Sequence, residues 1–280
     1  MKPLLDRVVP RVLLTAVSLS VIFLASLLIE VAYTGLGMLS PNLIRGYPSS
    51  DPSRAGLRPA IWGSVWVVGL AMLVALPLGV ATALYLSEYS RRGWLSKLIY
   101  FNLTNLAAVP SVVYGLVGLS FLGYFMGAGR SVLTGGLTLS FLILPLIVVA
   151  SMEAIRSVPE LHRLGAYALG ATRSQVVARI VLPEALPGIL TGSILAVSRA
   201  MGEAAPLLVI SGLIFVRDAP SGLLDGFTVL PLQIFSWILR PQEEFRRLSA
   251  AGIIVLLVLL LSMNSLAIVL RNMLQERRAE

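Results

Sequence analysis

Six long apolar runs, separated by short segments that carry most of the charge, dominate this sequence. They cover residues 12–36, 61–86, 103–126, 132–152, 186–215 and 250–270. A helix needs about 20 mostly apolar residues to cross the roughly 30 Å hydrocarbon core of a membrane, and each run is long enough to do so. The pattern therefore predicts an all-α membrane protein with six transmembrane helices.

The composition excludes the other broad classes of protein. Hydrophobic residues make up 57% of the chain and charged residues 13%, whereas about 25% of a soluble domain is charged. A disordered chain would instead be poor in apolar residues. The net charge of +8 does not indicate a nucleic-acid partner, because Lys and Arg lie in short segments between the apolar runs and form no basic domain. Cysteine is absent and His162 is the one histidine, so no disulfide and no catalytic metal centre is expected.

The distribution of Lys and Arg indicates the orientation. More of them lie in segments that are cytoplasmic if both termini are inside, which predicts a multi-pass protein of the cell membrane with cytoplasmic termini. The first run exceeds the roughly 7–15 apolar residues of a signal peptide and is expected to stay as an anchor. We divide the chain into an N-terminal helix and external loop (1–60), a transmembrane domain (61–271) and a cytoplasmic tail (272–280).

Several residues inside or beside the runs suggest more than a simple anchor. Proline recurs within the runs at Pro77, Pro110, Pro145 and Pro206. Each proline removes a backbone donor and is expected to bend or break its helix. Glu88, directly after the second run, is expected at the membrane interface, and Asn264 is expected to form an interhelical hydrogen bond.

The loop at 153–185 has a helical pattern although it lies between two spans. Its small and apolar residues predict a short helix, a turn at Gly170 and a second helix that leads into the fifth span. Pro183 and Pro187 are expected to stop that second helix. An amphipathic elbow of this kind could present a knob to a cytoplasmic partner, or it could simply lie on lipid headgroups.

Five residues of this loop resemble the conserved loop of the permeases of ATP-binding-cassette (ABC) importers. They are Ala166, Gly170, Ile180, Leu182 and Pro183, all in register with the family pattern. The family's glutamate falls on Leu164, so its acidic contact is lost here. The resemblance implies a type I ABC importer permease fold, in which this loop forms a coupling helix seated in a cleft of the ATP-hydrolysing subunit.

Arg199 and Glu203 lie within the fifth apolar run, four residues apart, and are expected to share a helix face. Charges deep in a membrane are costly and usually face a partner or a water-filled path. The two could form a structural ion pair. Alternatively they line a transport path, where a guanidinium held by Glu203 would offer a fork that matches an oxyanion.

Two segments resemble the permease subunits of phosphate ABC importers. The run from Arg199 through Ala-Met-Gly-Glu-Ala-Ala-Pro-Leu is similar to that of the PstA-type subunit, and residues 106–116 resemble a Pro-Ser-x-x-Tyr-Gly run of the same permeases. The resemblance implies that Arg199, Glu203, Ser111 and Tyr114 line the substrate pathway. It also implies these partners: a PstC-like permease subunit, two copies of a cytoplasmic ATPase subunit and an extracytoplasmic phosphate-binding protein.

The chain itself is expected to be a transport subunit and not an enzyme. It has no Gly-x-x-x-x-Gly-Lys-[Ser/Thr] run, so it binds no ATP by a P-loop, and ATP would be used by the partner ATPase. No other cofactor is expected. The alternatives are a permease for another oxyanion or small solute, an ion-coupled secondary carrier, or a membrane scaffold. Secondary carriers usually show paired halves, which this sequence lacks, and a scaffold has no need for charges in a span.

Overall fold

The computed structural model describes residues 2–90, 93–212 and 216–276, and within these ranges the chain is almost entirely helical. The long helices are α1 (Lys2–Gly35), α3 (Arg58–Leu84), α4 (Trp94–Ala108), α6 (Val132–Arg156), α9 (Leu182–Gly202) and α12 (Glu243–Glu276). The short ones are α2 (Pro41–Arg45), α5 (Ser111–Gly118), α7 (Glu160–Ala168), α8 (Arg173–Val176), α10 (Ala205–Ser211) and α11 (Leu230–Ile238). Turns of π-helix follow α3, α5 and α8, at Tyr85–Tyr89, Leu119–Phe125 and Val177–Val181.

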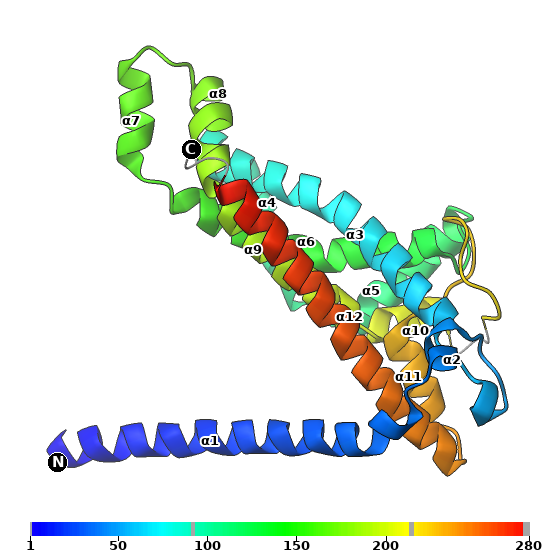
Figure 1. Ribbon diagram of the computed structural model, residues 1–280. Helices are drawn as coiled ribbons and strands as arrows, with labels where there is room; N and C mark the ends of the chain where they lie inside the picture. Colours follow the sequence, from blue (N-terminus) through cyan, green and yellow to red (C-terminus); the bar gives the residue numbers. More distant parts are fainter. Residues whose placement is uncertain (1, 91–92, 213–215, 277–280) are drawn as a thin grey trace.

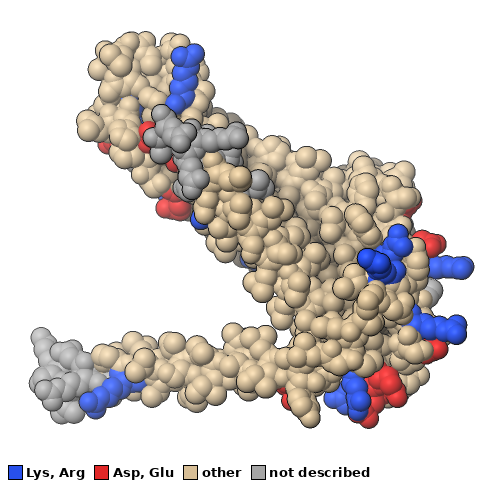
Figure 2. Space-filling view, viewed as in Figure 1, with Lys and Arg blue, Asp and Glu red and all other residues tan. Residues whose placement is uncertain are grey.

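The helical architecture confirms the all-α membrane fold. Five stretches are long and apolar enough to cross a membrane: Val9–Met38, Arg58–Tyr89, Val132–Arg156, Arg173–Gly202 and Glu243–Met273. The pair Trp94–Ala108 and Ser111–Phe125 makes a sixth span if it is counted as one, although its two halves are bent by 104°. On the face shown in Figure 2, charged side chains gather toward the ends of the bundle and the surface between them is largely apolar.

Helix α6 is the centre of the bundle, because it packs between α3 and α9. Small residues bring α6 and α9 together: a side chain at Gly188 would meet Ala154, and one at Gly192 would meet Ala150. Lipid tails are as apolar as the side chains, so helices in a membrane associate by such close packing. Val67, Leu139 and Ala196, from α3, α6 and α9, are fully buried in the resulting core.

Helix α1 lies apart from this bundle. It extends away from the other helices and approaches them only at its C-terminal end (Figure 1). There it packs against α12, but no residue of its most apolar window is buried within the chain. The length of α1 is therefore free to contact lipid or another subunit.

The prolines behave differently from one another. Pro77 and Pro145 lie inside helices α3 and α6, which continue through them. By contrast, the third predicted span is split at Pro110 into α4 and α5, and it begins earlier than expected, at Trp94. The fifth predicted span, 186–215, is also not one helix. Its first helix ends at Gly202, and α10 covers Ala205–Ser211.

Candidate functional site

A cavity of about 480 Å³ lies among α4, α5, α6 and the end of α9. Its apolar lining comes mostly from α4 and α6, and includes Leu103, Pro145 and Met152. The sequence-predicted pathway residues Ser111, Tyr114, Arg199 and Glu203 all line this same cavity. The structure therefore brings together four residues that are up to 92 positions apart in the chain.

The bend between α4 and α5 shapes one wall of the cavity. Pro110 has no N–H to offer the carbonyl of Leu106, and its ring would clash with that carbonyl in a continuous helix. The Leu106 oxygen accepts instead from the Val109 N–H, at 3.2 Å, and from the Tyr114 hydroxyl, at 2.8 Å. Tyr114 thus ties the two halves of the bent span together, and its hydroxyl proton is committed to the backbone.

Helix α9 ends at Gly202, between Arg199 and Glu203, the two residues that the sequence predicts to share a helix face. Glu203 follows the last residue of α9 and has extended backbone angles (φ −78°, ψ 116°). The cause is Pro206, because it cannot donate to the Gly202 carbonyl four residues earlier and its ring would collide with it. Among the described residues no ion pair or hydrogen bond joins the Arg199 and Glu203 side chains, so Glu203 does not hold the guanidinium.

Three side chains therefore face the cavity with unused hydrogen-bonding capacity. Within the described ranges, the guanidinium of Arg199, the carboxylate of Glu203 and the hydroxyl of Ser111 have no hydrogen bond or ion pair. Polar groups in a low-dielectric site are stabilised by a partner, whether protein, water or ligand. Arg199 and Ser111 offer donors to an anion, and Glu203 offers only acceptor oxygens while it is ionised.

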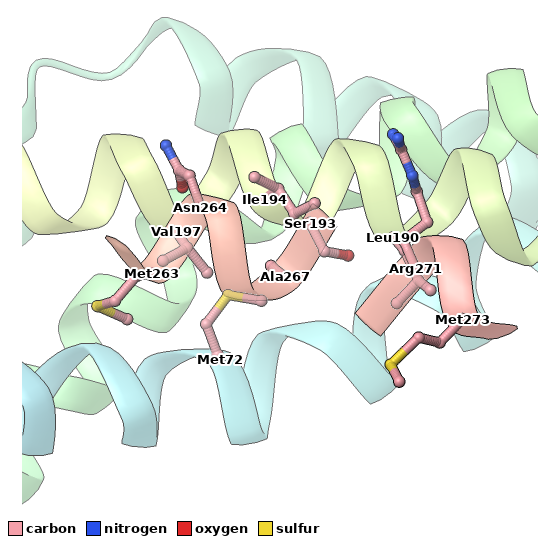
Figure 3. Close-up of a pocket in the computed structure, with 10 residues that line it drawn as sticks. All are labelled: Met72, Leu190, Ser193, Ile194, Val197, Met263, Asn264, Ala267, Arg271 and Met273. Atoms are coloured by element: carbon pink, nitrogen blue, oxygen red, sulfur yellow. The ribbon is translucent and has the colours of Figure 1, made fainter. Parts of the chain in front are cut away.

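A larger groove, of about 540 Å³, lies on another side of α9, between α3 and α12 (Figure 3). Its walls are almost wholly apolar. Its polar groups already have partners: Ser198 donates to Asn264 Oδ1 at 2.9 Å, and Arg271 donates to Thr191 at 2.9 Å. The first bond confirms the interhelical role predicted for Asn264. The groove presents few free polar groups, so the smaller cavity is the better candidate for an ionic substrate.

The loop between α6 and α9 folds as predicted up to its second helix. Helix α7 ends in a turn at Gly170, whose φ of +81° is unfavourable for residues with a side chain. The Gly170 N–H donates to the Tyr167 carbonyl and the Ala171 N–H to the Ala166 carbonyl, which is the Schellman arrangement that ends many helices. The hairpin of α7 and α8 projects beyond the bundle (Figure 1).

The other predicted coupling residues lie on or below this projection. Ala166 and Leu182 pack against a buried cluster that includes Val176 and Ile155. Gly170 and Ile180 line a small hollow beside Leu169, which is 91% exposed. The tip of the projection is thus apolar and open to a partner.

The prediction that Pro183 and Pro187 stop the second helix is wrong. A single apolar helical stretch runs from Arg173 to Gly202. Pro183 falls in the first turn of α9, where a missing N–H costs little. In the preceding π-helical turn, the Leu182 N–H donates to the Val177 carbonyl five residues back. This wider turn interrupts the α-helical hydrogen-bond pattern directly before the Pro183 ring.

The expectation that Glu88 lies at the membrane interface misses its contact with the loop. Glu88 is only 8% exposed, and its Oε1 lies 3.1 Å from Nη2 of Arg163 on α7. The sequence offered one signal for this contact: an acidic residue directly after an apolar run, together with arginines in the loop at 153–185. Their pairing depends on how α3 and α7 pack, which the sequence pattern does not give.

Comparisons with known proteins agree on one family. A family model described as "binding-protein-dependent transport system inner membrane component" matches residues 75–279. The chain is 35% identical over 226 residues to the probable ABC transporter permease protein YqgH of Bacillus subtilis, a match covering 74% of this chain and 72% of that one. It is also 35% identical over 225 residues to the phosphate transport system permease protein PstA 1 of Mycobacterium tuberculosis, covering 80% of this chain and 73% of that one.

A solved structure supports the fold. An inward-facing form of the MetNI methionine ABC transporter superposes with a TM-score of 0.63 at 16% identity, covering 81% of this chain and 99% of that one. The shared architecture is that of a type I ABC importer permease.

Proposed function

Because this chain belongs to the family of binding-protein-dependent transport system inner membrane components, and is thus an ABC importer permease, we propose that it carries inorganic phosphate into the cytoplasm. The observation that carries the proposal is the cavity in which Arg199, Ser111 and Glu203 all lack protein partners. The phosphate transport names among its relatives support the same substrate.

The Arg199 guanidinium suits an oxyanion. An anion that leaves water loses strong hydration, and a guanidinium replaces part of it with two parallel N–H donors. The Ser111 hydroxyl and the N-terminus of α5, where Ser111 is the first residue, add donors and a partial positive charge on the same wall. Apolar residues of α4 and α6 line the same cavity, and an apolar lining strengthens the electrostatic effect of these groups.

Glu203 favours phosphate over a fully deprotonated oxyanion. An ionised carboxylate can only accept hydrogen bonds. Phosphate at neutral pH keeps at least one O–H and can donate to Glu203, whereas sulfate has none and is repelled. The carboxylate also offsets part of the Arg199 charge, so the anion can leave again.

The wider assembly follows from the same proposal. The path would be completed by a PstC-like permease subunit, driven by two cytoplasmic ATPase subunits and supplied by an extracytoplasmic phosphate-binding protein. The α7–α8 hairpin would contact an ATPase subunit through Gly170 and its exposed neighbours. In this proposal the α7–α8 hairpin faces the cytoplasm, and both termini lie on the same side.

The experiment is phosphate uptake by vesicles that contain the assembled complex, normalised to complex content. Arg199→Gln should reduce uptake by at least about tenfold, since one charge-assisted hydrogen bond contributes about 1.5–3 kcal/mol and 1.4 kcal/mol is a factor of ten. Arg199→Lys keeps the charge but loses the planar fork and should impair uptake substantially. The double exchange Arg199→Glu with Glu203→Arg should take up as little phosphate as Arg199→Gln does, because the wild-type side chains form no ion pair that the exchange could re-form.

Two further measurements make the test specific. Arg130→Gln removes an exposed positive charge outside the cavity and should leave uptake unchanged. Glu203→Gln should weaken the preference for phosphate over sulfate in competition assays. Wild-type uptake by an assembled Arg199→Gln complex would show that Arg199 does not handle the anion. A wild-type complex that imports sulfate or another solute in preference to phosphate would contradict the substrate.

A further inference from the structure

Glu88 is a buried carboxylate that the transport path does not use. It lies in the π-helical turn Tyr85–Tyr89 at the end of α3. Its Oε1 pairs with Nη2 of Arg163 on α7 at 3.1 Å, and the side chains of Glu88 and Arg163 are 9% and 23% exposed. A buried pair of this kind joins the projecting loop to the bundle at one defined point.

Two more contacts attach the loop to the same region. Nη2 of Arg163 also donates to the Ile155 carbonyl near the end of α6, at 2.7 Å. Arg173, the first residue of α8, donates to the backbone carbonyl of Glu88, and its guanidinium lies over the Tyr89 ring at 5.4 Å from the centroid. Both limbs of the α7–α8 hairpin are therefore tied to residues 88–89.

The burial of these charges is hard to explain by stability alone. Burying an ion pair costs desolvation that its attraction often fails to offset, and an apolar pair of similar size is frequently as stable. The pair here is also incompletely satisfied, since Nε of Arg163 is buried without a hydrogen-bond partner. Such a pair is better suited to hold one orientation than to add stability.

The contact at Ile155 leads directly to the cavity. Met152 of α6 lines the cavity, and Ile155 lies three residues further along the same helix, a rise of about 4.5 Å. Helices α3 and α6 pack closely along their length. A displacement of α7 that is passed to Ile155 and Glu88 would therefore move the cavity wall.

We propose that Glu88, Arg163 and Arg173 form a latch that fixes the α7–α8 hairpin to the ends of α3 and α6. The latch passes movement of the ATPase to the cavity wall. A loosely attached hairpin would bend instead, and the movement would not reach the wall. The three are positioning residues, and the inference rests on the proposed function only in taking the hairpin as the ATPase contact. His162 and Glu184 form a second tie, from α7 to the first turn of α9 (Nδ1 to Oε2, 2.9 Å), but both side chains are more than one-third exposed.

The test separates positioning from stability by comparing single and double substitutions. Glu88→Gln leaves Arg163 buried without its counter-charge, so it should lower thermal stability as well as coupling. Glu88→Met combined with Arg163→Met removes both charges and should recover stability. The latch requires that the double variant still imports fewer solute molecules per ATP hydrolysed, by about tenfold, the factor that corresponds to 1.4 kcal/mol.

The matched control is Glu153→Gln, which breaks an ion pair with Arg156 at the end of α6 whose side chains are 67% and 59% exposed. It should leave the coupling ratio unchanged, because exposed pairs contribute little. Arg163→Lys keeps the charge and should retain part of the coupling. If the double Met variant recovers both stability and the wild-type coupling ratio, Glu88 and Arg163 are merely structural and the latch is excluded.

A second measurement needs no substrate and so stands apart from the identity of the transported solute. The chain has no cysteine, so spin labels can be placed at Leu161 on α7 and Leu78 on α3, which are 75% and 53% exposed. The distance distribution should be narrow in the otherwise wild-type complex and broad in the double Met variant. An unchanged distribution would overturn the latch, whereas failure of phosphate uptake in the wild type would overturn only the substrate.

Discussion

Gly192 shows how much one residue decides in this protein. It lies on α9 where that helix passes Ala150 of α6, and any Cβ at this position would overlap the Ala150 methyl group. The contact brings α9, which carries Arg199, against α6, which lines the opposite wall of the cavity. A side chain at Gly192 would therefore act on both stability and the site.

We expect Gly192→Ala to destabilise the subunit by about 1–3 kcal/mol, the usual cost of overpacking a close helix contact. Gly69→Ala is the matched control. Gly69 lies on α3 with open space around its would-be Cβ, and alanine is the better helix former. Thermal unfolding of the purified protein in one detergent checks both. Equal unfolding midpoints for the two variants would contradict the close contact.

At the scale of the element, the α7–α8 hairpin depends on its turn. The positive φ of Gly170 allows the two backbone bonds that end α7 and redirect the chain toward α8. Leu161 in α7 and Leu169 beside the turn are both largely exposed. The turn thus determines where the apolar tip is presented.

Gly170→Ala should destabilise the hairpin by about 1–2 kcal/mol, since a side chain disfavours the left-handed conformation. We expect weaker binding of the ATPase subunit, measured by titrating the purified ATPase onto the reconstituted permease. Gly165→Ala, on the same hairpin within helix α7, has open space and no positive φ, so it should bind as the wild type does. Unchanged ATPase affinity in Gly170→Ala would mean that the turn does not position the contact.

At the scale of the whole molecule, the face shown in Figure 2 carries its charged side chains mainly toward two opposite ends, with a largely apolar surface between them. The loop between α2 and α3, which contains Ser49, and the α7–α8 hairpin lie at opposite ends of the bundle (Figure 1). If the apolar middle lies in the membrane, these two segments must face different compartments.

Single cysteines at Ser49 and Leu169, introduced separately into this cysteine-free chain, should react with a membrane-impermeant thiol reagent from opposite sides. We expect Ser49→Cys to be labelled in intact cells and Leu169→Cys only after the membrane is opened. Labelling of both from outside would contradict the topology and, with it, the place of the hairpin as the ATPase contact.

The sequence alone determined the position of the apolar runs, the helical character of the loop at 153–185 and its turn at Gly170, because hydropathy and local backbone preference depend on neighbouring residues. Its motif positions also pointed to Arg199, Glu203, Ser111 and Tyr114, which the structure places around one cavity. The tertiary structure decided which prolines break a helix. At Pro110 the Leu106 carbonyl accepts from the Val109 N–H and, across the bend, from the Tyr114 hydroxyl, whereas α6 continues through Pro145 within a closely packed core.

Charge pairing likewise depended on the fold. Spacing in the chain suggested that Glu203 holds Arg199, but the helix ends between them and leaves both facing the cavity. Glu88 and Arg163 are 75 positions apart, and they pair because α7 lies beside the π-helical turn that follows α3. A pairing between distant elements is set by the packing of those elements, so a local sequence pattern cannot predict it.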